Sequence, residues 1–270
     1  MRRRDGRCGW CVAVWLCAGP GLTAWALSVS PPVVELRVSA GARSEGSFLV
    51  RNDTQQPLVL TVETEALSPQ GYLQRPCADW LQVAPDRLVL EPGQQDEVRY
   101  TVSVPAGAQG ELAAEVVFVQ AFSSPETGGV QVRFGMALYV SIAGTEQLDL
   151  RVEPMRLQAG QPPTVWIPMT NQGNVHCRPQ GTVTVIGVQG QLVAQGILSR
   201  GLPVPPAQTA TFSVPLGETL MPPGTYRLLV DLTCHATANL PAHVSVEQAG
   251  HLDENGQWIA SQTASSPKSR

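Results

Sequence analysis

The sequence lacks the short motifs that identify most hydrolases, metalloproteases and nucleotide-binding enzymes. After residue 26 there is no Gly-x-Ser-x-Gly elbow, no His-Glu-x-x-His pair and no glycine-rich loop of the kind that holds phosphate. Histidine occurs only at His176, His235, His243 and His251, and a triad built from these and one of many serines is arbitrary. The sequence therefore predicts a protein that is not an enzyme and needs no cofactor.

An uninterrupted apolar run long enough to cross a membrane is missing from the N-terminal region. The run Trp10–Leu22 is short for a transmembrane helix because a Gly-Pro-Gly sequence breaks it. Arginines precede this run, and Ala24-Trp25-Ala26 follows it with the small-x-small pattern that signal peptidase reads. We predict a signal peptide over residues 1–26, export to the periplasm or cell envelope, and no membrane span after cleavage. An uncleaved membrane anchor is the alternative.

Basic and aromatic surface patches are also missing. Without residues 1–26, Lys+Arg falls from 18 to 14 and Asp+Glu from 22 to 21, which gives a net charge of −7. No basic stretch with interleaved aromatics remains, which argues against a nucleic-acid partner. Trp80, Trp166 and Trp258 are scattered and do not predict the aromatic platform that a carbohydrate-binding module needs.

Helical periodicity is absent, and short alternating segments take its place. The segments Val98–Val104, Val165–Met169 and Tyr226–Leu232 each alternate apolar with other residues, and proline and glycine separate such segments along the chain. Short strands with regular turn signals predict an all-β protein built of two immunoglobulin-like β-sandwich domains in tandem.

An internal echo supports the division into two domains. Pro92-Gly93-Gln94 and Pro206-Ala207-Gln208 each precede an alternating strand and then a proline. We place the first domain at residues 27–144, the second at 145–249 and a polar, mobile tail at 250–270. The alternative for the tail is a tight turn at Asn255-Gly256, followed by a short apolar segment at Trp258 and Ile259.

Three cysteines remain after residue 26, and the exported setting permits disulfides. Cys177 and Cys234 are expected at adjacent ends of two neighbouring antiparallel strands, which predicts a disulfide between them. The alternative is a zinc site that adds His176 and His235, but neighbouring residues on a strand point to opposite faces, so we predict no metal. Cys77 is left as a buried or idle thiol.

The stretch Val130–Ile142 alternates apolar with other residues without exception. A strand of this length extends about 40 Å at about 3.3 Å per residue and tends to outrun the core of one small domain. We therefore predict that Val130, Val132 and Phe134, at its start, contact another protein.

At the end of the first domain we expect a strand at residues 113–122, a loop at 123–129 and a long last strand at 130–142. Together with the Val38-Ser39-Ala40-Gly41 turn and Asn52-Asp53, this order resembles the periplasmic chaperones of the chaperone–usher pilus pathway. The resemblance implies two immunoglobulin-like domains in a boomerang, whose last strand of the first domain, G1, completes a pilus subunit by strand addition.

That family anchors the subunit's C-terminal carboxylate with an arginine near the start of the chain and a lysine on G1. Here the matching positions fall close to Val33 and Ala137, neither of which binds a carboxylate. Arg37 and Arg133 lie on the same two expected strands and are candidates for a relocated carboxylate anchor.

The sequence thus predicts an exported, non-enzymatic protein that binds another exported protein by strand addition, as a divergent periplasmic chaperone does. The alternative is a structural or scaffolding envelope protein, in which the strand at 130–142 faces its own core throughout.

Overall fold

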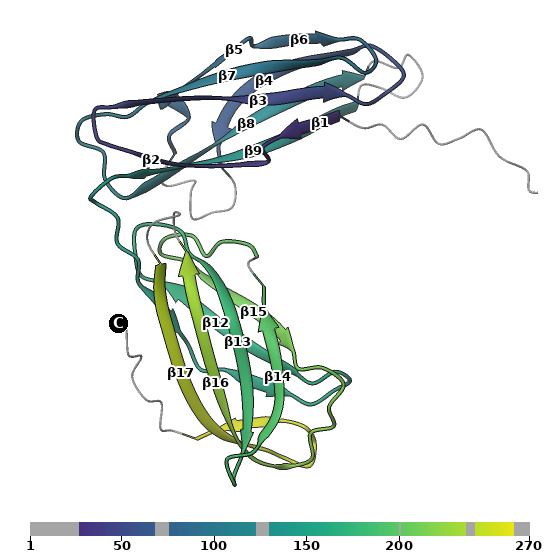
Figure 1. Cartoon of the computed structure of the whole chain (residues 1–270), viewed down its shortest axis with the longest axis vertical. Coiled ribbons are helices and arrows are strands. Elements are labelled where there is room, and N and C mark those ends of the chain that lie inside the picture. Colours follow the sequence, from purple (N-terminus) through teal and green to yellow (C-terminus); the bar gives the residue numbers. More distant parts are fainter. Residues whose placement is uncertain (1–26, 68–75, 123–129, 200, 236–240, 262–270) are drawn as a thin grey trace, which may run out of the picture.

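A computed structural model describes residues 27–67, 76–122, 130–199, 201–235 and 241–261 of the chain. The predicted signal peptide (1–26), the predicted loop at 123–129 and residues 262–270 lie outside this described part. Within it, the only helical element is a short 3-10 turn, η1 (Ala78–Trp80), and no helix is long and apolar enough to cross a membrane. Two β-sandwiches, joined by the connection after β9, lie at an angle to each other (Figure 1).

The first sandwich consists of a four-stranded and a five-stranded sheet. In spatial order, the first sheet contains β1 (Leu27–Ser30), β3 (Arg43–Asn52), β7 (Gln95–Ser103) and β5 (Leu81–Ala84). The second contains β2 (Val33–Val38), β9 (Val130–Ile142), β8 (Glu111–Phe122), β4 (Leu58–Ala66) and β6 (Arg87–Leu90).

The second sandwich also has two sheets. One has β12 (Thr164–Asn171) paired with β10 (Leu150–Val152), β11 (Arg156–Gln158) and β15 (Thr209–Pro215). The other, in spatial order, contains β14 (Leu192–Leu198), β13 (Arg178–Gly187), β16 (Gly224–His235), β17 (Pro241–Leu252) and β18 (Trp258–Ala260).

This arrangement confirms the predicted fold class, all-β with two immunoglobulin-like sandwiches in tandem. Each pair of sheets encloses an apolar core, and in the first sandwich Phe48 packs edge-on against Phe118 with ring centroids 6.0 Å apart. The alternation in the strands produces these cores because every second side chain faces the opposite sheet. The boundary near residue 144 stays a prediction; the first strand beyond it begins at Leu150.

The internal echo maps onto equivalent positions in the two sandwiches. The carbonyl oxygen of Gln94 accepts the backbone N–H of Asn52, and that of Gln208 accepts the N–H of Asn171, both at 2.9 Å. The residue before each glutamine has a left-handed backbone, with φ of 76° at Gly93 and 57° at Ala207. Each domain therefore has an equivalent turn beside an equivalent buried asparagine, Asn52 in the first and Asn171 in the second.

The segment from Gly250 to Ser261 differs from the predicted mobile tail. β17 continues to Leu252, and β18 pairs with it from Trp258 to Ala260. Between them, Oδ1 of Asp253 accepts the backbone N–H groups of Asn255 and Gln257 at 2.9 and 2.8 Å. This hairpin corresponds to the alternative with a tight turn at Asn255-Gly256. The sequence did not favour it because the turn is polar and its second strand has only three residues.

Candidate functional site

β9, the strand that carries the predicted contact residues, is paired on one side along only part of its length. On one side β8 pairs with β9 along its whole length, from Val130 to Ser141. On the other side β2 runs parallel to β9 but pairs only from Ala137 to Ile142. Among the described residues, no strand pairs with Val130–Met136 on that side. We call these seven residues the open edge.

The backbone groups that face the open edge follow from the register. The N–H of Ala137 donates to the carbonyl of Pro32, on the β2 side, whereas the N–H of Ile142 donates to Gly110, on the β8 side. Because successive residues of a strand point alternately to its two neighbours, the odd-numbered residues present their N–H and C=O to the open edge. At residues 131, 133 and 135 these groups are available to an additional strand.

From Phe134 onward, the even-numbered side chains of β9 face the first core. Met136, Leu138 and Val140 are buried, whereas Phe134 is half-buried and packs against the core from its rim. Val132 is also half-buried. For Val130 only the backbone is described, and it pairs with Phe122. Two of the predicted contact residues, Val132 and Phe134, therefore lie where the core-facing row is no longer fully buried.

The two candidate anchor arginines are not brought together. Nε of Arg37 lies 2.6 Å from Oε1 of Glu146, in the connection between the sandwiches. Arg133 contacts the carboxylates of Glu63, at 3.3 Å, and Glu65. Arg37 lies opposite Ser141, eight residues from Arg133 along β9, which corresponds to about 26 Å. A single carboxylate therefore cannot bridge the two.

Val33 and Ala137 lie directly opposite each other in the β2–β9 register. The sequence analysis placed the anchor positions of the resembled family close to these two residues. Their side chains carry no charge here, so the pairing of the strands is present without the anchor.

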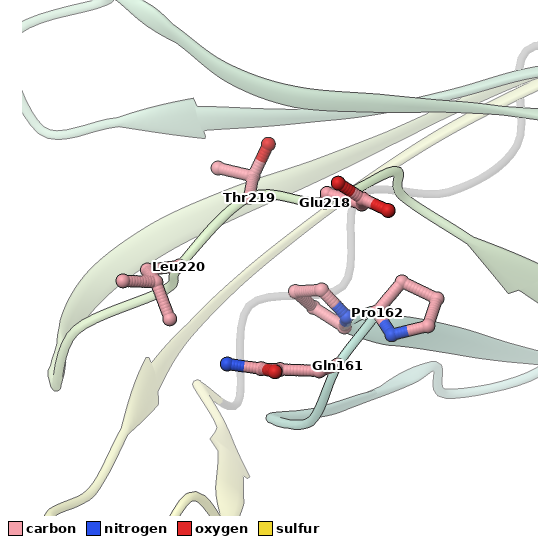
Figure 2. A pocket seen from close by; sticks show the side chains of 6 residues that line it. Gln161, Pro162, Glu218, Thr219 and Leu220 are labelled. Atoms are coloured by element: carbon pink, nitrogen blue, oxygen red, sulfur yellow. The ribbon is translucent and has the colours of Figure 1, made fainter. Parts of the chain in front are cut away.

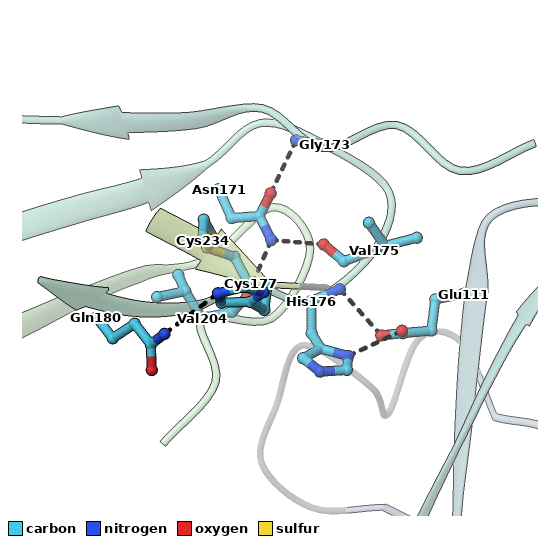
Figure 3. The surroundings of a disulfide bond; sticks show 10 residues. Glu111, Asn171, Gly173, Val175, His176, Cys177, Gln180, Val204 and Cys234 are labelled. Carbon is cyan, nitrogen blue, oxygen red and sulfur yellow. Dashed lines mark hydrogen bonds and ion pairs between the residues drawn. A yellow bond between two sulfur atoms is a disulfide. The ribbon is translucent and has the colours of Figure 1, made fainter. Parts of the chain in front are cut away.

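The structure joins Cys177 and Cys234 in a disulfide, with Cα atoms 5.6 Å apart, as predicted (Figure 3). The side chain of His176 turns away from this bond toward Glu111 of the first sandwich (Figure 3). Within the described part of the chain, no group of three or more histidine, cysteine, aspartate or glutamate side chains is placed to bind a metal ion.

His176 belongs to a buried polar network between the sandwiches, which we call the junction network. Glu111 accepts the backbone N–H of His176 at 3.0 Å and faces its Nδ1 at 2.8 Å, and it also accepts the hydroxyl of Ser141 at 2.9 Å. Nε2 of His176 lies 3.5 Å from Oε1 of Glu35, which also accepts Nε of Arg178 at 3.1 Å. The network thus links β2, β8 and β9 to the start of β13.

The electrostatics of the junction network favour its charged form. The hydrogen bond with His176, opposed by burial and supported by Arg178, lowers the pKa of Glu35 to about 2. Burial acts to lower the pKa of His176, but hydrogen bonds and charges of Glu111 and Glu35 outweigh it, so this pKa is raised. Burial, with the nearby charge of Glu111, raises the pKa of the Cys77 thiol to about 12 and keeps it inert.

Sequence reasoning missed the junction network. It treated His176 only as a possible zinc ligand or catalytic base and did not single out Glu35, Glu111 or Arg178. No local pattern marks these residues, since they are brought together only by the pairing of β2, β8 and β9 and the position of β13.

Two surface hollows in the second sandwich offer no catalytic arrangement. One, of about 450 Å³, lies between Gln161–Pro163 and Glu218–Leu220, and Glu218 is the only ionisable group among the described residues that line it (Figure 2). The other, of about 610 Å³, is lined by Trp166 and Trp258, which looked unrelated in the sequence. The indole N–H of Trp166 already donates to Gln158 at 3.1 Å.

No protein-family model matches the chain, and no curated protein sequence matches it significantly. Fimbrial periplasmic chaperones recur among the solved structures that are similar to it. The crystal structure of the class 5 fimbriae chaperone CfaA is 12% identical, with a TM-score of 0.47 over 90% of this chain and 100% of that one.

Two further examples are similarly distant. A chain in the structure of the Salmonella enterica SafA pilin with the SafB chaperone is 14% identical, with a TM-score of 0.46 over 83% of this chain and 97% of its own. The E. coli chaperone DraB is 16% identical, with a TM-score of 0.43 over 76% and 91%. At these scores the similarity by itself assigns no function.

Proposed function

We propose that this chain is an exported, non-enzymatic protein of the periplasm or cell envelope that binds another exported protein by strand pairing at the open edge of β9. It acts as a divergent periplasmic chaperone, with no membrane span of its own after signal cleavage. The observation that carries the proposal is the register: within the described part of the chain, β9 is paired on both sides from Ala137 onward and on one side only from Val130 to Met136.

An open edge of this length favours strand addition because its backbone groups are ready to pair with a further strand. Main-chain hydrogen bonds at residues 131, 133 and 135 supply affinity in this arrangement. Val130, Val132 and Phe134 supply specificity in this proposal. Phe134 already packs against the apolar core, and the residues that alternate with it along the strand would enter the interior of an incomplete partner sandwich.

The partner's C-terminal carboxylate has no anchor at Val33 and Ala137, and Arg133 is neutralised by Glu63 and Glu65. In this proposal, affinity therefore depends on backbone pairing and apolar contacts along β9.

The alternative is a scaffolding protein in which β9 faces the core of its own sandwich along its whole length. The packing of Phe134 against the rim of the first core favours this reading. A charged side chain introduced at the start of β9 distinguishes the two functions. It weakens partner binding if the open edge binds a partner, whereas a scaffold binds no partner at that edge.

Val132→Asp is expected to reduce capture of the partner at least tenfold and to leave the thermal unfolding transition nearly unchanged. Val132 is half-buried at an open edge, so the carboxylate stays hydrated in the free protein but is trapped in an apolar contact in the complex. The measurement is a pull-down from envelope extract, with the captured protein identified and quantified by mass spectrometry.

Val89→Asp is the matched control, because Val89 is 55% exposed on β6, at the opposite edge of the same sheet. The Val89→Asp variant is expected to capture as much of the partner as the unaltered protein does. If Val132→Asp unfolds the first sandwich instead, that position is core and the scaffolding reading is favoured.

A further inference from the structure

The hollow of about 610 Å³ in the second sandwich brings together two tryptophans that lie far apart in the sequence. Trp166 of β12 and Trp258 of β18 both line it, and both are half-buried, so each keeps part of its indole ring accessible. Arg156 and Gln158 of β11 and the turn residues Asn255–Gln257 also line it. The sequence predicted no aromatic platform because these positions meet only through the contact between β11 and the hairpin that ends in β18.

One wall of the hollow is the outer face of β11 and β12. Arg156 lies directly opposite Trp166 in the register of these strands, and Leu157, the next residue, is buried in the core. Since successive side chains of a strand point to opposite faces, Arg156, Gln158 and Trp166 share the outer face. Oε1 of Gln158 accepts the indole N–H of Trp166 at 3.1 Å, which holds this ring against β11.

The other wall is the turn between β17 and β18, which its own hydrogen bonds hold in place. Oδ1 of Asp253 accepts the backbone N–H groups of Asn255 and Gln257. The carbonyl of Gly256 accepts the N–H of Ala159 at 3.4 Å, which ties the turn to the end of β11. Gly256 has a φ of 75°, which glycine adopts readily. The hollow is therefore formed before any ligand binds, as binding sites usually are.

The tryptophans offer the hollow apolar ring surface and no free hydrogen-bond donor. A Cβ atom at Gly250 would overlap the ring of Trp258, so this glycine makes room for the indole. The indole N–H of Trp258 is buried and has no hydrogen-bond partner in the described part of the chain, and that of Trp166 is taken up by Gln158. What a ligand meets on these two residues is ring carbon.

The polar lining is uncharged apart from one cation. Arg156 is exposed and is the only ionisable group among the described residues that line the hollow. Gln158, Asn255 and Gln257 supply amides, which both donate and accept hydrogen bonds. A guanidinium binds a carboxylate through two parallel hydrogen bonds. The lining therefore suits a ligand that combines an apolar face, hydroxyl groups and a negative charge.

We propose that this hollow binds an acidic saccharide, with one face of a sugar ring against Trp166 and Trp258 and a carboxylate at Arg156. A pyranose ring presents C–H groups on its faces, and the electron-rich face of an aromatic ring attracts them. Its hydroxyls, like the amides, both donate and accept. An apolar peptide segment would instead leave the amides and the guanidinium desolvated and unpaired, which is costly.

This binding is independent of strand pairing at β9. The hairpin that ends in β18, drawn in yellow, lies at the end of the second sandwich away from the first (Figure 1). Val132→Asp, which is expected to reduce partner capture, is therefore expected to bind saccharide as the unaltered protein does.

An array of oligosaccharides, probed with the full mature chain, tests the proposal. The array carries oligomers with galacturonic, glucuronic or sialic acid, and neutral oligomers of glucose and N-acetylglucosamine. We expect retention on acidic members. The acidic oligosaccharide that is bound best is then titrated by calorimetry beside its methyl ester, which has the same rings but no carboxylate charge, and we expect the ester to bind at least fivefold more weakly.

Arg156→Gln is expected to weaken binding of the acid at least fivefold and to leave binding of the ester unchanged. Trp166→Ala is expected to weaken both at least tenfold. Arg151→Gln is the matched control, because Arg151 is an exposed arginine on β10, the other neighbour of β12. It is expected to bind as the unaltered protein does. Arg156 is exposed, so its variant stays informative if Trp166→Ala fails to fold.

Retention of no acidic oligosaccharide overturns the proposal, as does binding that Arg156→Gln leaves unchanged. Equal affinity for the acid and its ester contradicts the carboxylate contact at Arg156. If no oligosaccharide is retained and both variants lose partner capture in the pull-down, the hollow is a protein contact and the saccharide assignment is wrong.

Discussion

Removal of the Cys177–Cys234 disulfide is expected to lower the free energy of unfolding of the second sandwich by about 4 kcal/mol. The bond closes a loop of 57 residues, and this figure is the loop-closure entropy that the cross-link removes from the unfolded chain. Both cysteines are buried in the second core, so the native state has little room to relax after the loss.

Chemical denaturation followed by circular dichroism, with and without reductant, measures this effect. The double variant Cys177→Ala/Cys234→Ala is expected to unfold at lower denaturant concentration and to be insensitive to reductant. Cys77→Ala, which removes the free buried thiol of the first sandwich, is expected to respond to reductant as the unaltered protein does. An unaltered protein whose midpoint ignores reductant contradicts the prediction.

Replacement of either buried asparagine by alanine is expected to destabilise its own sandwich by about 3–5 kcal/mol. Nδ2 of Asn171 donates to the carbonyls of Val175 and Val204 at 2.8 and 2.9 Å, and its Oδ1 accepts the N–H of Gly173 at 2.9 Å (Figure 3). Alanine leaves the Val175 carbonyl and the Gly173 N–H without this partner, whereas the Val204 carbonyl keeps the N–H of Cys177. Each buried unsatisfied group costs about 1–3 kcal/mol.

Asn52 plays the same part in the first sandwich, where Nδ2 donates to the carbonyls of Gln56 and Leu90 and Oδ1 accepts the N–H of Thr54. Because the two sites are equivalent, Asn52→Ala and Asn171→Ala should have similar costs, each in a different unfolding transition. Asn174→Ala is not a suitable control, since that residue bridges the connection between the sandwiches. Asn255→Ala, in the exposed turn before β18, is expected to change stability by less than about 0.5 kcal/mol.

The local sequence pattern was sufficient to predict the fold class and the Cys177–Cys234 disulfide. Alternation at period two identified the long strand at residues 130–142, and strand adjacency predicted the disulfide, because both depend on neighbouring positions along one or two strands. It failed at β18, where the strand is too short to show alternation and the polar residues before it resemble a tail.

The candidate site was only partly accessible to sequence reasoning. The length of β9 indicated that part of it lies beyond its own core, but the position of the open edge depends on where β2 stops pairing, which no local pattern records. The junction network depends on residues 35, 111, 176 and 178, which lie on three strands and one loop. Arg37 and Arg133 were grouped because they are basic residues on the two strands that carry the anchor in the resembled family, yet nearby carboxylates hold each of them separately.

Capture by the paired variants Arg133→Pro and Arg133→Ala tests the proposed strand addition most directly. Both lose the contacts with Glu63 and Glu65, but only proline also removes the N–H that points to the open edge, away from the β8 ladder. The account predicts that, in pull-downs matched for folded protein, Arg133→Ala captures the partner as the unaltered protein does and Arg133→Pro captures at least tenfold less. Equal capture by the two variants would show that no strand pairs at this edge.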